Sequence, residues 1–236
     1  MNFSVHTLLL QTLLANDTIN QIVVEEKTLS IMQLITSGGT GGTIIMGALG
    51  ILSVFAVYIL FERYSAINKA SKEDKNFFKS IKNFVEQKDL TAAKTLCQNT
   101  DNPIARMIEK GVDRIDKPMT DISAAIENQG KLEIYKMENN LANLATIAGV
   151  APMIGFLGTV IGMIVAFHEM ASAGGNIDVE MLSKGIYTAM VTTVAGLIVG
   201  IIAYIAYNYL VTKVEKVIFQ MEARTTEFLD HIHHSE

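Results

Sequence analysis

Four threonine hydroxyls lie beside small residues in the middle of long stretches of the sequence that carry mostly apolar side chains. Thr159 lies in one stretch, and Thr188, Thr192 and Thr193 lie in the next. A single threonine in such a stretch commonly bonds the carbonyl of its own helix four residues earlier. Four hydroxyls beside small residues instead indicate a polar seam along an interior surface, which is typical of an ion or substrate path.

Glycines accompany these hydroxyls at steps of three and four residues. They are Gly155, Gly158 and Gly162 in the first stretch and Gly185, Gly196 and Gly200 in the second. In lipid, small residues let two helices approach closely and gain van der Waals contact. We therefore predict that the six glycines serve helix packing and that the four threonines line the path of an ion.

The same two stretches contain no Asp, Glu, Lys or Arg, and His168 lies at the end of the first. Carrying a charge across the hydrocarbon of a membrane generally needs an ionisable side chain. If the chain helps to conduct protons, the side chain that carries them has to come from another polypeptide.

The elements that position these residues are predicted to be membrane-spanning helices. Half of the 236 residues are hydrophobic and only 18% are charged, which excludes a disordered chain and is too apolar for an ordinary soluble domain. A helix crosses a membrane with about 20 apolar residues. Three windows without charge meet that length, and the predicted spans are residues 43–61, 141–168 and 185–212.

The basic residues orient these spans. Seventeen of the nineteen Lys and Arg residues lie in segments 62–140 and 213–236. The positive-inside rule places both segments in the cytoplasm. The N-terminal segment 1–42 and the loop 169–184 then lie on the outer side of the membrane, in the periplasm.

The apolar run Leu8–Leu14 near the N-terminus allows two interpretations. It is similar to the core of a signal peptide, but no Lys or Arg precedes it and no A-x-A site comes before Asp17. We expect an uncleaved amphipathic segment on the outer face, and a cleaved signal peptide is the alternative.

Segment 62–140 is predicted to be helical throughout. Asp89 is a candidate N-cap, and Asn102 before Pro103 is a cap followed by a proline at the first helical position. No proline or turn cluster lies between Met119 and the start of the second span, so we expect one long helix from about Thr120 through that span. The fold class is an all-α integral membrane protein with three transmembrane helices and long cytoplasmic helical extensions.

Composition argues against several other classes of protein. The net charge of −5 disfavours a nucleic-acid-binding protein. The lone Cys97 excludes an internal disulfide and a multi-cysteine zinc site. His231, His233 and His234 have no carboxylate or cysteine at metal-ligand spacing, so we expect a solvated tail there. We expect no catalytic residue, no metal and no other cofactor.

The two glycine-rich spans together resemble the MotA/TolQ/ExbB proton-channel family, and most closely its ExbB branch. The similar residues run from Ala151-Pro152 through Gly155, Gly158, Thr159 and Gly162, and then from Gly185 through Ala189, Thr192, Thr193 and Gly196. The resemblance is dense over residues 145–212, and the pair of spans is more specific than either half. The layout of three spans with an outer N-terminus agrees with this branch.

The resemblance implies an assembly rather than an enzyme. Its second and third spans would form a homopentamer around the single spans of an ExbD-type partner, which supplies the proton-carrying Asp. The complex would sit in a bacterial inner membrane and drive a TonB-type protein. The resemblance places Thr159 and Thr193 at the pore threonines of the family. Several members carry Glu where this chain has Thr188, so no carboxylate role transfers to that position.

Three functions remain open at this stage. The first is a proton-driven subunit for TonB-dependent transport, and the second is a TolQ-like subunit or another motor of the cell envelope. The third is a passive membrane scaffold that needs no proton motive force. The sequence alone does not separate H⁺ from Na⁺ as the ion.

Overall fold

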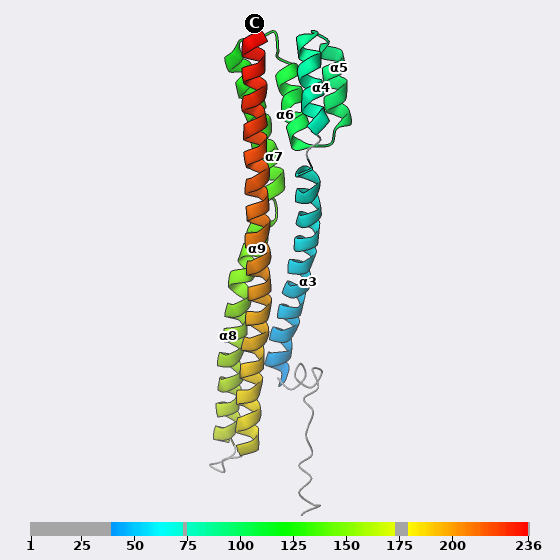
Figure 1. Cartoon of the computed structure of the whole chain (residues 1–236). Coiled ribbons are helices and arrows are strands. Elements are labelled where there is room, and N and C mark those ends of the chain that lie inside the picture. Colours follow the sequence, from blue (N-terminus) through cyan, green and yellow to red (C-terminus); the bar gives the residue numbers. More distant parts are fainter. Residues whose placement is uncertain (1–38, 73–74, 173–178, 236) are drawn as a thin grey trace, which may run out of the picture.

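The structure, a computed structural model, describes residues 39–72, 75–172 and 179–235 as one elongated molecule (Figure 1). Within these ranges every regular element is an α-helix. A shaft is formed by three long helices: α3 (Gly39–Ala70), α8 (Leu141–Ser172) and α9 (Val179–Ser235). A bundle at one end contains the last part of α9 and four shorter helices: α4 (Lys75–Glu86), α5 (Leu90–Asn99), α6 (Pro103–Val112) and α7 (Met119–Glu138). The described residues leave out most of segment 1–42 and part of loop 169–184. The two interpretations of Leu8–Leu14 therefore concern residues outside the described part of the chain.

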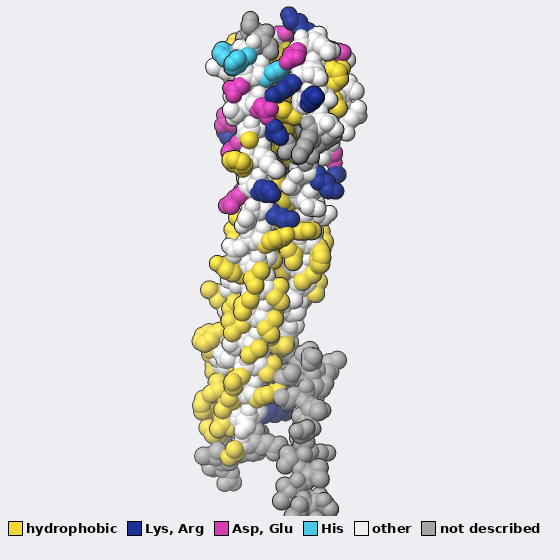
Figure 2. Space-filling view, in the orientation of Figure 1, with side chains coloured by type: hydrophobic (Ala, Val, Ile, Leu, Met, Phe, Trp, Pro, Cys, Tyr) yellow, Lys and Arg dark blue, Asp and Glu magenta, His cyan; other side chains and the backbone are white. Residues whose placement is uncertain are grey.

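Three helical stretches are long and apolar enough to cross a membrane. They are Gly41–Ala70, Met119–Ser172 and Leu182–His234. Each contains one of the predicted spans, so the prediction of an all-α membrane protein with three spans is confirmed. Figure 2 shows the same division on the surface, because hydrophobic side chains cover the shaft and most charged side chains gather on the bundle.

Helix α9 connects the shaft to the bundle without a break. Its 57 residues span about 86 Å at 1.5 Å per residue. In the bundle its fully buried Phe228 packs against α6 and α7. A Cβ on Gly111 of α6 would lie 2.8 Å from the Phe228 ring and 2.7 Å from Ile126 of α7. A side chain at this position would require the Ile126 and Phe228 side chains to shift.

Two helix starts in the bundle have the caps that the sequence predicts. The Asp89 carboxylate accepts a hydrogen bond of 3.0 Å from the Ala92 amide at the start of α5. The Asn102 side chain accepts one of 2.8 Å from the Ile104 amide, with Pro103 at the first position of α6. Both predictions are confirmed, since each side chain satisfies an amide that has no carbonyl partner in its own helix.

The prediction of one unbroken helix from about Thr120 through the second span is wrong. Helix α7 ends at Glu138 and α8 begins at Leu141. Between them Asn140 has a φ of 64°, in the left-handed region, which asparagine tolerates better than most residues. The sequence signal was the pair Asn139-Asn140, which contains neither proline nor glycine.

Candidate functional site

Helices α8 and α9 are in close backbone contact along the glycines of both. A Cβ on Gly155 would lie 2.8 Å from the Thr192 carbonyl oxygen, and one on Gly196 would lie 2.6 Å from the Ala151 carbonyl oxygen. These distances are shorter than real Cβ contacts, so neither position has room for a side chain. The six glycines predicted for packing all lie in this contact, since Gly158, Gly162, Gly185 and Gly200 also face atoms of the opposite helix.

The structure divides the four threonines into two pairs. Thr188 and Thr192 are buried, with 7% and 1% of their surface exposed, whereas Thr159 and Thr193 are half-buried. Thr192 lies against Gly158 of α8 and donates a hydrogen bond of 2.8 Å to the Ala189 carbonyl of its own helix. The Thr188 methyl group lies 3.1 Å from where a Cβ on Gly42 of α3 would be, so Thr188 faces that helix. The geometry thus sets this buried pair within the packing of the three spans.

Thr193 makes a hydrogen bond between the two helices. Its hydroxyl donates to the Gly155 carbonyl of α8 at 3.1 Å. Thr159 donates to the Phe156 carbonyl of its own helix at 2.6 Å. The two half-buried hydroxyls therefore bond the carbonyls of adjacent residues, and only Thr193 reaches across to the other helix.

These bonds determine what the half-buried hydroxyls can bind next. A threonine hydroxyl has one proton to donate and two lone pairs that accept. Because a carbonyl oxygen can only accept, the hydroxyl hydrogens of Thr159 and Thr193 are both already engaged in these hydrogen bonds. Their oxygens are left to accept, so this part of the seam offers binding to a donor such as water or a protonated carboxylic acid.

The described parts of the three predicted spans, residues 43–61, 141–168 and 185–212, contain no Asp, Glu, Lys or Arg. His168 is exposed at the end of the second span. Among the residues that the structure describes, no group of three His, Cys, Asp or Glu side chains could hold a metal ion.

The bundle has a buried ionic cluster that sequence reasoning missed. Glu133 of α7 is 2% exposed and accepts hydrogen bonds from Arg106 of α6 at 2.7 Å and from Lys136 at 2.8 Å. Partial burial lowers the pKa of Arg106, but the carboxylates of Glu133 and Asp101 outweigh burial and raise it overall. Arg106 and Glu133 are 27 residues apart, and no local pattern marks them as partners. The cluster fixes α6 to α7.

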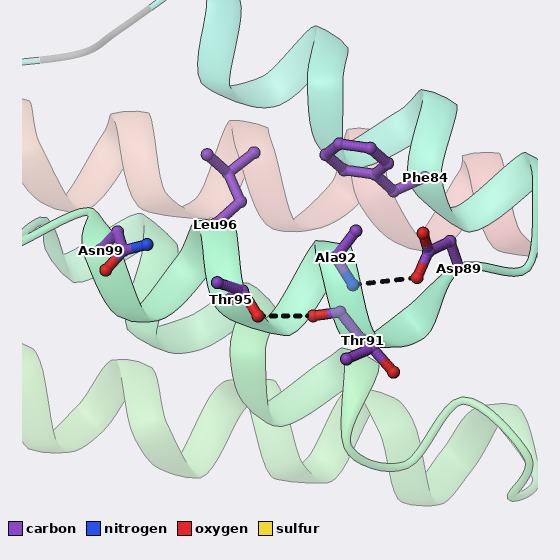
Figure 3. Close-up of a pocket in the computed structure, with 7 residues that line it drawn as sticks. All are labelled: Phe84, Asp89, Thr91, Ala92, Thr95, Leu96 and Asn99. Atoms are coloured by element: carbon purple, nitrogen blue, oxygen red, sulfur yellow. Dashed lines mark hydrogen bonds between the residues drawn. The ribbon is translucent and has the colours of Figure 1, made fainter.

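An open groove of about 490 Å³ lies between α4 and α5 (Figure 3). Phe84 and Leu96 form its apolar part. Its polar groups serve α5 itself, since Asp89 caps the Ala92 amide and the Thr95 hydroxyl donates to the Thr91 carbonyl at 2.8 Å. We therefore assign these groups to the stability of α5.

Comparison with known proteins gives a family for this architecture. The sequence model described as the MotA/TolQ/ExbB proton channel family matches residues 99–223, more than half of the chain. The chain is 33% identical over 111 residues to the biopolymer transport protein ExbB of Aquifex aeolicus, covering 46% of this chain and 74% of that protein. It is 27% identical over 194 residues to a protein of Methanothermobacter thermautotrophicus named as an ExbB homolog, covering 82% and 67%. It is 39% identical over 85 residues to the Tol-Pal system protein TolQ of Haemophilus influenzae, covering 36% and 37%. The chain therefore belongs to the MotA/TolQ/ExbB proton channel family and is a multi-pass membrane protein.

Proposed function

We propose that the chain is the proton-channel subunit of an inner-membrane complex of the ExbB–ExbD type, which uses the proton motive force to energise TonB-dependent transport across the outer membrane. The proposal rests on one observation. The half-buried hydroxyls of Thr159 and Thr193 lie in spans without a charged side chain, and each donates a hydrogen bond to a backbone carbonyl.

With this arrangement, the side chain that gains and loses the proton has to come from a partner protein. Proton transfer through lipid needs a group that gains and loses a proton, and the spans of this chain have no carboxylate. A single-span partner with an Asp, as in an ExbD-type protein, supplies that group. Its protonated carboxyl is a donor and can bond the Thr159 and Thr193 oxygens, whereas the carboxylate is acceptor-only. The seam therefore favours the neutral, proton-loaded form of the carrier.

The proposal also specifies the number of copies in the complex and the orientation of the chain in the membrane. A homo-oligomer, which we propose to be a pentamer, surrounds the partner spans with α8 and α9 of each copy. The N-terminus lies in the periplasm and the bundle lies in the cytoplasm, in agreement with the distribution of Lys and Arg. Native mass spectrometry of the purified complex measures the copy number directly.

The experiment tests Thr159→Val and Thr193→Val, which keep the shape of the side chain and remove the hydroxyl. The matched control is Thr146→Val, because Thr146 is exposed on α8 and donates to the Ala142 carbonyl of its own helix. Cells that depend on this chain and its partners should lose receptor-dependent uptake with either seam variant and keep it with the control. Co-purification of the partner should stay unchanged in all three. Normal uptake with both seam variants would refute the role of the hydroxyls.

A second candidate is a TolQ-like subunit that serves envelope integrity, favoured by the 39% identity over 85 residues to TolQ. The two candidates differ in the protein that receives the force. Uptake assays and detergent-sensitivity assays on the same deletion strain separate them. A passive scaffold would function unchanged in the presence of an uncoupler.

A further inference from the structure

The break between α7 and α8 leaves backbone groups that an unbroken helix would satisfy. Helix α7 ends at Glu138, and the last four carbonyls of any helix have no amide partner within it. The Asn139 amide still bonds the Tyr135 carbonyl at 3.0 Å, but the chain turns away at Asn140. The Lys136 carbonyl therefore needs a donor from elsewhere.

That donor is Arg63 of α3. Its Nη1 donates a hydrogen bond of 3.0 Å to the Lys136 carbonyl, 73 residues along the chain. Arg63 is only 8% exposed, and it is also paired with the neighbouring Glu62. A buried cation at the C-terminal end of a helix both satisfies a carbonyl and counters the negative end of the helix dipole.

Glu62 contacts the other side of the break. The Asn140 side-chain amide donates to Glu62 at 3.4 Å, while the Asn143 amide donates back to the Asn140 oxygen at 3.3 Å. Two consecutive residues of α3 therefore hold the end of α7 and the residue in the left-handed conformation. Helix α9 passes the same level without a break (Figure 1).

We propose that Arg63 is a positioning residue. By capping α7 it selects the broken form of residues 119–172 over a continuous helix, and so it sets where α8, with Thr159, leaves the bundle. A continuous helix is the alternative form, since at the junction of α7 and α8 only Asn139 and Asn140 interrupt the helical pattern. Because α7 is fixed to α6 through Glu133, the break sets the direction in which α8 leaves these two helices. This inference goes beyond the proposed function and needs no partner protein.

The test measures the distance between spin labels on either side of the break in the full chain, by double electron–electron resonance. Asn128 on α7 and Gly149 on α8 are suitable sites for Asn128→Cys and Gly149→Cys, since both are exposed. In a straight helix these positions would be about 32 Å apart. We expect a distance that differs from about 32 Å in the otherwise native chain, and a shift toward about 32 Å with Arg63→Met.

Three further variants make the result specific. Arg63→Lys keeps a cation and a donor and should retain the native distance. Asn140→Gly, which favours the left-handed region, should restore the native distance in the Arg63→Met background. Arg114→Met replaces an exposed arginine of the bundle and should change nothing.

If Arg63→Met does not fold, Asn140→Ala provides the second route, because alanine disfavours the left-handed region and should shift the distance toward that of a straight helix. A native distance with Arg63→Met, or a native distance with Asn140→Ala where Arg63→Met cannot be measured, would overturn the proposal.

Discussion

The substitution Gly196→Ala tests how closely α8 and α9 pack. The added Cβ would lie 2.6 Å from the Ala151 carbonyl oxygen and 2.8 Å from the Gly155 Cα. Both are backbone atoms, so no side chain can rotate to relieve the contact. Ordinary contacts begin at 3.4 Å, and the helices must therefore separate by roughly 0.8 Å, the difference between 3.4 Å and 2.6 Å.

The magnitude follows from three contributions. Inserting a methyl group into a packed contact costs about 1–3 kcal/mol. Separation also stretches the bond from Thr193 to the Gly155 carbonyl, and an interhelical hydrogen bond in a membrane contributes about 0.6 kcal/mol. Alanine favours the helix over glycine by about 1 kcal/mol, which offsets part of the loss. We expect a net destabilisation of about 0.6–2.6 kcal/mol, or a fall of about 1–10 °C in Tm for a chain of this size.

The control is Gly149→Ala on α8, where an added Cβ would meet no atom within 4 Å. That substitution has only the gain in helix propensity, so its Tm should be equal to or above that of the wild type. The assay is the thermal unfolding of both variants and the wild type in one detergent, followed by size-exclusion chromatography. A Tm for Gly196→Ala that matches Gly149→Ala would refute the close contact.

Two further predictions concern the bundle. Burial, with nearby carboxylates adding to it, raises the pKa of the Cys97 thiol to about 12, so maleimide should label Cys97 slowly at pH 8 in the folded chain and quickly once it is unfolded. Hydrogen bonds from Lys69 and Arg106 lower the pKa of Asp101 from its usual value, so its stabilising contribution is present above the unfolded pKa of about 3.9 and is lost as the pH falls through the lower folded pKa. Asp101→Asn should therefore flatten the acid limb of a stability-against-pH curve.

The helices could be predicted because their signals are local. A span needs only a long apolar window, and caps such as Asp89 and Asn102 act within three residues of their own position. The packing glycines were also visible as a repeat along each helix. Direct backbone contact at Gly155 and Gly196 is what such a repeat makes possible.

The features that could not be predicted from the sequence depend on contacts between residues far apart in the chain. The four threonines have the same chemistry and similar surroundings in sequence, and only the packing of α8 on α9 separates the buried Thr192 from the half-buried Thr193. The break at Asn140 was missed for the same reason. The donor that stabilises it, Arg63, comes from 77 positions earlier and looked like one more basic residue at the end of a span.

The three spans of one copy are too little buried to enclose a channel by themselves. In the most hydrophobic windows of the three helices only 22%, 22% and 33% of residues are buried within the chain. Large side chains beside the seam, such as Phe156 and Met190, are more than 60% exposed. A path for protons has to be closed off from lipid on all sides, since an ion in contact with hydrocarbon is strongly disfavoured. Under the proposed function, helices α8 and α9 of one chain would provide one wall of such a path, and further copies and a partner helix would complete it.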